Sequence, residues 1–211
     1  MRNTFSNLSF YRLDKKHNLS SEDLKRIAEL IYQTDPYIYP AVFLSQDNAI
    51  KVIPEMIVTG DRMFCSKNIF VAELDSEIAG IVLWHQGELF WTTDHYEKVI
   101  DKLQIPPSPY IELVNKVYFR SYSNTRSDII SIINVCIFEK HRGVGIGSAL
   151  IEAFLQETAG LCREYELFVL ADNKNAVKLY MNYGFHVSDT INGFSVDQID
   201  LPCYRMIKLC Y

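Results

Sequence analysis

Three glycines at alternate positions, Gly143, Gly145 and Gly147, follow a strongly apolar run and precede an amphipathic one. Glycine lets the main chain approach a ligand closely and adopt dihedral angles that other residues avoid. Where such a turn opens a helix, successive main-chain N–H groups point outward and the helix dipole favours an anion. Arg142 adds a positive charge beside the turn. The pattern predicts a phosphate site, and a pyrophosphate fits it best.

Three other interpretations of this turn compete with that one. A Walker loop requires Lys and then Ser or Thr after its last glycine, but Ser148 and Ala149 follow Gly147, which excludes it. A dinucleotide fingerprint requires G-x-G-x-x-G; Asp172 would be its ribose-binding acid, but only about forty residues remain for the further parallel units of such a site. The third interpretation is a turn that only packs a helix on a sheet, and this motif alone does not decide against it.

The elements around the turn follow from hydrophobic patterning. Residues Ile129 to Phe138 form a nearly continuous apolar run, typical of a central strand buried on both faces. We expect a helix from about Gly147 to Thr158, a buried strand from Glu166 to Ala171, and a helix from Asn175 to Tyr183. The turn therefore lies between a central strand and the helix that follows it.

The residue pattern of the N-terminal half predicts a mixture of helices and strands. Ser20 to Asp23 has the residue types of a helix start, and the prolines of Thr34 to Pro40 end that helix. A second helix, from about Asn48 to Val58, contains Pro54, which should bend or split it. The remaining predicted elements are strands at Leu8–Leu13, Asn68–Leu74 and Glu77–His85, an insertion at about 88–126 with helices at Thr93–Leu103 and Pro109–Tyr122, and terminal strands near Phe185–Ile191 and Tyr204–Leu209.

Two motifs together resemble a known family. The run from Arg142 to Gly147 matches the R/Q-x-x-G-x-G/A signature of the GNAT superfamily of N-acetyltransferases. Downstream, Asn173, Ala176, Tyr180 and a closing Gly-Phe are similar to the second recurring element of that superfamily. The resemblance covers the second half of the chain closely and the first half by topology.

The resemblance implies a single α/β domain over residues 1–211. Its fold would be a GNAT-like mixed central sheet of about six to seven strands flanked by helices. Two central parallel strands would splay apart, and the helical insertion at about 88–126 would lie between the third and fourth strands. Long insertions in compact domains are often functional lids, so this one would cover the acceptor or form a dimer face.

The co-substrate implied by the resemblance is acetyl-CoA, lying in the gap between the splayed strands. Main-chain groups near Val135 and Ile137 would bond the pantetheine arm like an added strand and stabilise charge on the thioester oxygen. The glycine turn would hold the pyrophosphate. The residues implied to contact the cofactor are Val135, Cys136, Ile137, Arg142, Gly143, Val144, Gly145, Ile146, Gly147, Ser148, Asn173, Ala176 and Tyr180.

Tyr180 would lie near the thioester sulfur and act as the general acid, because a phenol has a pKa close enough to that of a departing thiolate. An ordinary core tyrosine is the alternative. Asn173 would cap its helix and reach the pantetheine, or only cap. Tyr183 is expected to pack. Cys136, in an apolar strand, is expected to be a buried, inert thiol rather than an acetyl carrier.

The sequence says less about which residues would bind the acceptor amine. The loop that contains Asp35, Tyr37 and Tyr39 would form a rigid wall suited to a small cation with an apolar part, or would only pack its tyrosines on the sheet. Asn134 is a polar candidate on the central strand. No general base stands out; weak candidates are Glu73, His85, Glu139 and His141.

Composition and charge narrow the class of protein to which the chain could belong. The net charge is −5, and no dense Lys/Arg run predicts a nucleic-acid partner. No apolar stretch could span a bilayer, and the N-terminus lacks a signal-peptide core, so no membrane association is expected. Five cysteines without a C-x-x-C pair indicate free thiols in a reducing cytoplasm, and five scattered histidines predict no metal site. A homodimer is compatible with the sequence.

We therefore expect a cytoplasmic N-acetyltransferase that moves an acetyl group from acetyl-CoA to a primary amine of a small molecule or peptide, by direct attack in a ternary complex. The alternative is a non-catalytic acyl-CoA-binding or regulatory module, which keeps the phosphate turn but lacks a working acid and base.

Overall fold

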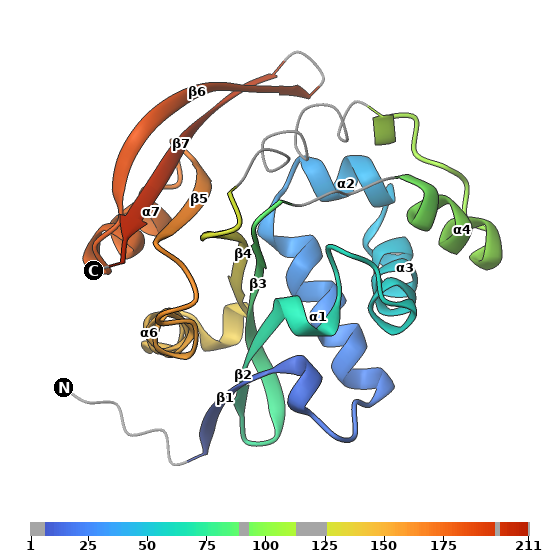
Figure 1. Ribbon diagram of the computed structural model, residues 1–211. Helices are drawn as coiled ribbons and strands as arrows, with labels where there is room; N and C mark the ends of the chain where they lie inside the picture. Colours follow the sequence, from blue (N-terminus) through green and yellow to red (C-terminus); the bar gives the residue numbers. More distant parts are fainter. Residues whose placement is uncertain (1–6, 89–92, 113–125, 197–198, 211) are drawn as a thin grey trace.

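The computed structural model describes residues 7–88, 93–112, 126–196 and 199–210 (Figure 1). Within these residues one mixed sheet has the strand order β1-β2-β3-β4-β5-β7-β6. Its strands are β1 (Leu8–Arg12), β2 (Ile69–Leu74), β3 (Glu77–Gln86), β4 (Ile129–Ile137), β5 (Glu164–Leu170), β6 (His186–Val196) and β7 (Ile199–Leu209). The β4–β5 pair is parallel and the other pairs are antiparallel.

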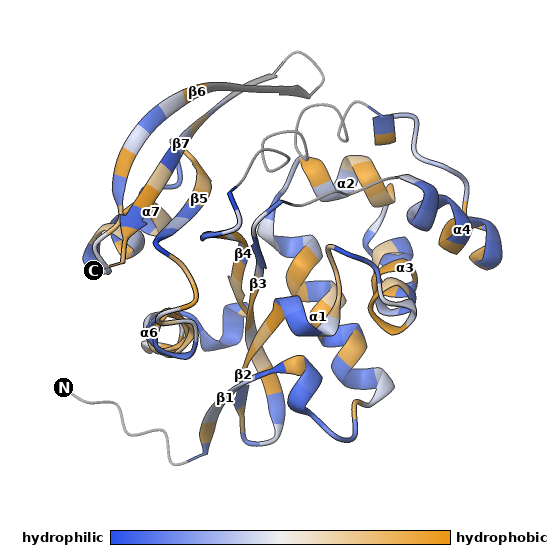
Figure 2. Ribbon diagram, in the orientation of Figure 1, coloured by the Kyte–Doolittle hydropathy of each residue, from blue (hydrophilic) through white to orange (hydrophobic). Residues whose placement is uncertain are grey.

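Helices cover both faces of the sheet (Figure 1). One apolar cluster joins the sheet to α1 (Ser21–Thr34), α2 (Ile38–Phe43), α3 (Gln46–Thr59) and α4 (Thr93–Leu103). A second cluster joins the opposite face to α6 (Ile146–Glu157) and α7 (Lys174–Asn182). In Figure 2 the central strands are largely hydrophobic, whereas α1, α4 and α6 carry both colours, as amphipathic helices do. The predicted fold is confirmed.

The central parallel strands separate along their length. β4 and β5 are paired from Ile129 opposite Glu164 to Ile132 opposite Leu167. Beyond that point β4 continues to Ile137 and β5 to Leu170 without pairing to each other. The predicted splay is therefore present, with its vertex at Ile132.

A β-bulge in β4 lies at this vertex. Trp84 of β3 is opposite Ile132, but the preceding Leu83 is opposite Asn134, so Ile133 is the extra residue. Side chains alternate along a regular strand, and a bulge shifts that alternation by one residue. Ile132 packs with the α6 cluster, and Ile133 packs with the α1 cluster. The bulge therefore turns Asn134 toward α1 and α2, where its side chain contacts Thr34 and Tyr39.

The local structure agrees with most of the sequence-based predictions for the N-terminal half. Ser20 and Asp23 form a reciprocal capping box at the start of α1, as expected. The β2–β3 hairpin is confirmed, and both turn residues have positive φ. Pro54 was predicted to bend or split its helix; the split is wrong, because α3 runs from Gln46 to Thr59 with Pro54 inside it, and the bend stays a prediction. The helix predicted at Thr93–Leu103 is confirmed as α4, whereas the one at Pro109–Tyr122 falls mainly outside the described residues.

The loop expected around Pro40 contains a short helix instead. α1 ends at Thr34 as predicted, but Ile38 to Phe43 form α2. Pro40 lies in the first turn of this helix, where a main-chain N–H has no intrahelical partner to lose. The oxygen Oδ1 of Asp35 accepts hydrogen bonds from the N–H groups of Tyr37 and Ile38, at 2.8 and 2.7 Å, and starts the helix.

Candidate active site

The glycine turn has the backbone geometry that requires glycine. Gly143 has φ +77° and Gly145 has φ +100°, both in the region that L side chains rarely adopt. A Cβ at either residue would meet no atom within 4 Å, so the dihedral angle alone demands glycine there. Gly147 differs, because it already lies within α6 and a Cβ would make an ordinary contact 3.5 Å from Ile137.

The N-terminus of α6 is open. Side chains cap α1, α3 and α7, but Gly145 at the cap position of α6 has none, and no described side chain caps this helix. The first N–H groups of a helix have no intrahelical acceptor and attract anions. The exposed Arg142 lies beside them and donates from Nε to the carbonyl oxygen of Ile137 at 2.9 Å, which ties the turn to the end of β4. The turn therefore fits a pyrophosphate.

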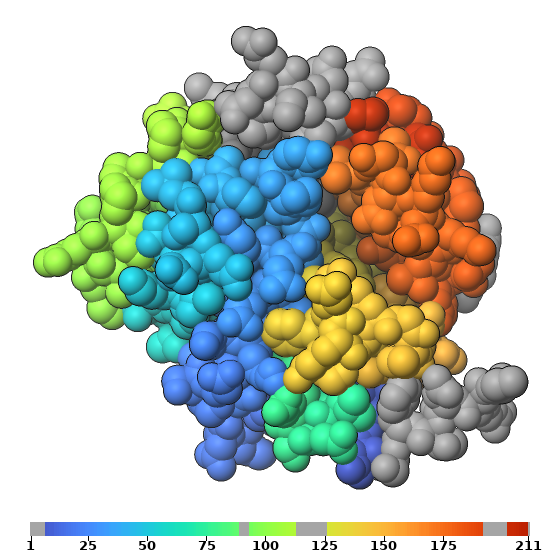
Figure 3. All heavy atoms as spheres, turned by 180° about the vertical axis from the view of Figure 1, so that it is seen from behind, coloured from blue at the N-terminus to red at the C-terminus, as the bar shows by residue number. Residues whose placement is uncertain are grey.

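The gap beyond Ile132 exposes main-chain groups of β4. The N–H of Phe138 donates to Ala79 of β3 at 3.0 Å. Because hydrogen-bonding directions alternate along a strand, the main-chain groups of Val135 and Ile137 point away from β3, toward the gap. In Figure 3 the surface is hollowed between the blue residues of α1–α2 and the orange residues of α7, with residues in the colour of β4 at its floor. The hollow suits an extended chain.

α7 borders this gap on the other side. Asn173 caps α7, its side-chain oxygen accepting the N–H of Ala176 at 3.2 Å, as predicted. Tyr183 donates from its hydroxyl to the carbonyl of Ser148 at 2.7 Å, so it packs α7 on α6, also as expected. Tyr180 is buried edge-to-face against Phe185.

Tyr180 and Cys136 are both buried. Burial, and then the nearby Cys136, raise the pKa of Tyr180 well above its usual value, so its phenol keeps its proton. Within the described residues no group hydrogen-bonds the Tyr180 hydroxyl. Burial also raises the pKa of the Cys136 thiol, despite the nearby Arg142. Less thiolate forms at neutral pH as a result, and the thiol is a poor nucleophile.

The residues predicted on the acceptor side form hydrogen bonds with one another and with α1. Tyr39 donates to Oδ1 of Asn134 at 2.6 Å, and Nδ2 of Asn134 donates to the Thr34 hydroxyl at 2.7 Å. Tyr39 is only 2% exposed, so it packs on the sheet rather than forming an open wall. Tyr37 is half-buried, and burial raises the pKa of Asp35.

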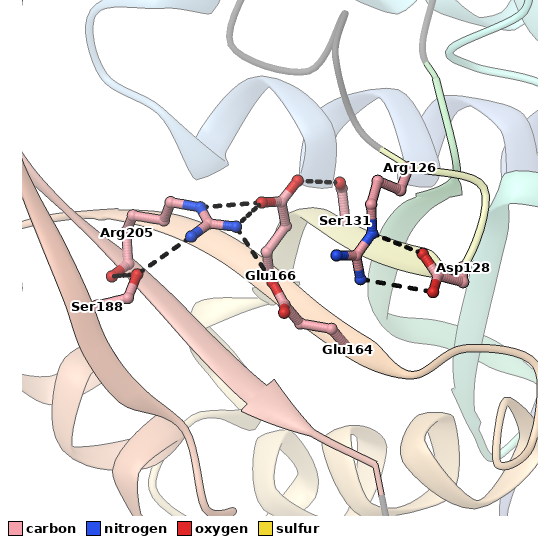
Figure 4. Close-up of polar contacts among 7 residues, drawn as sticks. All are labelled: Arg126, Asp128, Ser131, Glu164, Glu166, Ser188 and Arg205. Atoms are coloured by element: carbon pink, nitrogen blue, oxygen red, sulfur yellow. Dashed lines mark hydrogen bonds and ion pairs between the residues drawn. The ribbon is translucent and has the colours of Figure 1, made fainter.

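A buried charge network lies at the closed end of the splay (Figure 4). Glu166 of β5 is 4% exposed; it accepts a hydrogen bond from Ser131 of β4 at 2.7 Å and is paired with Arg205 of β7 at 2.8 Å. Arg205 also bridges to Glu164 at 3.2 Å and reaches Ser188 of β6. Four strands are thus joined on the side of the vertex where β4 and β5 still pair.

Sequence reasoning missed this network. The signal that could have found it is a charged residue inside each of two predicted strands, Glu166 in a buried strand and Arg205 in a terminal one, because buried charges are normally paired. The base candidates on the hairpin strands lie elsewhere. Glu73 is held by Tyr11 and Lys16, and His85 lines a separate cavity.

The structure thus brings the predicted cofactor residues together around the gap. β4 supplies Val135 to Ile137, the turn supplies residues 142–148, and α7 supplies Asn173, Ala176 and Tyr180. Among the described residues, no group of three His, Cys, Asp or Glu side chains could hold a metal ion. Nor is any helix in the described ranges long and apolar enough to cross a bilayer. The five cysteines are free.

Comparison with known proteins gives a consistent match. A family model described as the acetyltransferase (GNAT) family matches residues 44–185. No curated protein sequence matches the chain. A solved acetyltransferase is similar at TM-score 0.67 and 22% identity, over 96% of this chain and 100% of that one. An N-acetyltransferase from Staphylococcus aureus Mu50 is similar at TM-score 0.65 and 20% identity, over 94% and 99%. Arabidopsis thaliana Naa50, solved with the bisubstrate analogue CoA-Ac-MVNAL, is similar at TM-score 0.53 and 17% identity, over 96% and 98%.

Proposed function

The chain belongs to the acetyltransferase (GNAT) family and is an acyltransferase, and from this premise we propose that it transfers the acetyl group of acetyl-CoA to a primary amine of a small molecule or peptide. The observation that carries the proposal is the parting of β4 from β5 after Ile132, beside the open N-terminus of α6. An extended chain that ends in a pyrophosphate matches both features at once.

Each part of the gap has a separate role in this proposal. The main-chain N–H groups of the turn at residues 143–148 would hold the pyrophosphate, with Arg142 beside them. Main-chain groups of Val135 and Ile137 would bond the pantetheine as a strand does. Acetyl-CoA supplies an activated acyl group at the end of that arm. Tyr180 holds a proton on its phenol oxygen and would donate it to the leaving group.

Direct transfer in a ternary complex is favoured over a covalent enzyme intermediate. Such an intermediate would need a thiolate in the gap, and Cys136 of β4 is the thiol considered for that role. Cys136 is only 6% exposed, and burial raises the pKa of its thiol. The amine itself is therefore the better nucleophile.

An amine suits the charge of the chain. Its net charge is −5, and two carboxylates, Glu164 and Glu166, lie near the vertex of the gap, where each is paired with Arg205. Such a field attracts a protonated amine. Support for a peptide acceptor comes from Arabidopsis Naa50, whose solved complex holds the analogue CoA-Ac-MVNAL.

The test combines calorimetry with acetyl-CoA, a screen of small amines and peptide N-termini, and two phenylalanine variants. Tyr180→Phe should retain acetyl-CoA binding and lose about 100-fold or more in kcat. Tyr183→Phe removes a similar hydroxyl from the same helix and should keep its turnover. Tight acetyl-CoA binding with no turnover on any amine would favour the non-catalytic module. Unchanged kcat in Tyr180→Phe would remove its acid role.

A further inference from the structure

A polar cavity of about 520 Å³ lies where β1 and β3 end and β2 begins. We call it the β3-end cavity; it is lined by Arg12 of β1, Arg62 and Lys67 from the segment between α3 and β2, and Trp84 of β3, together with neighbouring residues. No residue of β4, of the turn at 142–148 or of α7 belongs to this lining. The turn follows the far end of β4, a strand of nine residues that spans roughly 25 Å at about 3.3 Å per residue. The two sites are separate.

Two buried hydrogen-bond donors in this cavity have no acceptor. Nε of Arg12 and Nε1 of Trp84 are both buried, and neither has a hydrogen-bond partner within the described residues. Trp84 as a whole is only 7% exposed, with its ring edge-to-face against Phe154. Buried polar groups almost always have partners, and leaving one unpaired is unfavourable. Because Arg12 and Trp84 both line the cavity, a ligand there can bring the acceptor that each donor lacks.

The charges around these donors favour an anion. Arg62 and Lys67 have no ion-pair partner within the described residues. The buried Asp61 is already engaged, because its Oδ1 accepts the N–H groups of Met63 and Phe64 at 2.8 and 3.0 Å. Arg12 is paired with Asp14 at 2.8 Å, so Arg62 and Lys67 are the cations of the lining that remain to attract an anion, with Glu88 as the other carboxylate.

His85 does not change this balance. Burial, together with the positive charge of Lys67, lowers the pKa of His85, while its contact with the carbonyl of Gly87 acts in the opposite direction. The imidazole is therefore neutral at pH 7.

We propose that the β3-end cavity is a second ligand site that binds the oxyanion of a small phosphate- or carboxylate-bearing metabolite. Trp84 Nε1 and Arg12 Nε donate to the oxyanion, and Arg62 and Lys67 supply the positive field. Indole and guanidinium N–H groups are donors only, so they suit an acceptor-only group such as phosphate or carboxylate. Because Trp84 is opposite Ile132 at the β4 bulge, the site adjoins the strand that borders the active-site gap.

The test uses the full chain with its two tryptophan indoles labelled with ¹⁵N. Inorganic phosphate and malonate are titrated separately, with sodium chloride keeping the ionic strength constant. The Trp84 indole N–H resonance, assigned by its loss in Trp84→Phe, should shift and saturate. Tighter binding of phosphate identifies a phosphate-bearing ligand, and tighter binding of malonate identifies a carboxylate-bearing one.

Variants test the two donors. Arg12→Lys keeps the positive charge but lacks Nε, and it should weaken binding about 3- to 10-fold. Trp84→Phe keeps an aromatic ring against Phe154 and should weaken binding to a similar extent by calorimetry. Arg163→Lys, an exposed residue outside the cavity lining, is the matched control and should bind as the parent does.

Saturating CoA separates this proposal from the proposed function. Phosphate could also bind the turn at 142–148, but CoA would occupy that turn and leave the Trp84 response intact. If the protein fails to bind CoA, the proposed function fails while the cavity test stands. The proposal is overturned if the resonance moves no more than with chloride, if Arg12→Lys matches the parent, or if CoA abolishes the response.

Discussion

Gly145→Ala isolates the backbone requirement of the glycine turn. Gly145 has φ +100°, and a Cβ there would meet no atom within 4 Å, so the substitution adds strain without a clash. A left-handed conformation costs a non-glycine residue about 1–2 kcal/mol. In a chain of 211 residues, that free energy corresponds to a fall in Tm of roughly 2–8 °C.

Gly147→Ala is the matched comparison. Gly147 lies inside α6, where its φ is not in the positive region, and a Cβ would make an ordinary 3.5 Å contact with Ile137. Alanine is a better helix former than glycine by up to about 1 kcal/mol, so this variant should be as stable as the parent or slightly more stable.

The assay is thermal and urea unfolding followed by circular dichroism, with calorimetric titration of CoA on both variants. Gly145→Ala should lose both stability and CoA affinity, because the main-chain N–H groups cannot converge if the turn relaxes. Gly147→Ala should retain both. Equal stability of the two variants, or the reverse order, would refute the idea that the positive φ of Gly145 shapes the turn.

Four further substitutions test polar interactions, three of them near the gap and one at Glu73 of β2. Asn134→Ala removes one buried and one partly buried hydrogen bond and should lower the free energy of unfolding by about 2–3 kcal/mol in urea, whereas Tyr39→Phe removes the buried one of these two and should lower it by about 1 kcal/mol. Arg205→Met breaks the ion pair with the buried Glu166 and should lower the free energy of unfolding by about 2–4 kcal/mol, less than for a fully buried pair because the Arg205 side chain is 30% exposed; parent-like stability would contradict this. Burial raises the pKa of Glu73, but hydrogen bonds from a tyrosine hydroxyl and a lysine ammonium outweigh burial and lower that pKa below its ordinary value of 4.5. The ionised Glu73 therefore contributes its full stabilisation of the fold above pH 4.5, and this stabilisation is lost as pH falls through the pKa of the folded state. Glu73→Gln should therefore reduce the fall in the free energy of unfolding at acid pH. An unchanged fall would contradict a stabilising role for the ionised Glu73.

The second half of the chain was predictable because its signals are local. The spacing of Gly143 and Gly145 encodes a backbone conformation that few other residues adopt, and the structure shows positive φ at both. Asn173 is a preferred cap residue and caps α7. Apolar periodicity likewise placed β4 and α6 to within a residue or two.

The missed features depend on contacts between distant segments. The bulge at Ile133 follows from how β3 pairs with β4, and nothing in the apolar run around Ile133 marks one residue as the extra one. Because the bulge turns Asn134 toward α2, the packing of Tyr39 was equally hidden. Helix α2 formed around Pro40 because a proline in a first turn loses no hydrogen bond, a tolerance that the prediction of a loop overlooked.

A crystal structure of the protein with CoA would show whether the gap between β4 and β5 holds the cofactor. We expect pyrophosphate oxygens within hydrogen-bonding distance of the main-chain N–H groups between Gly143 and Ser148, and the pantetheine arm alongside Val135 between β4 and β5. Density for CoA elsewhere on the surface, with β4 and β5 paired beyond Ile132 and Leu167, would disprove this binding mode.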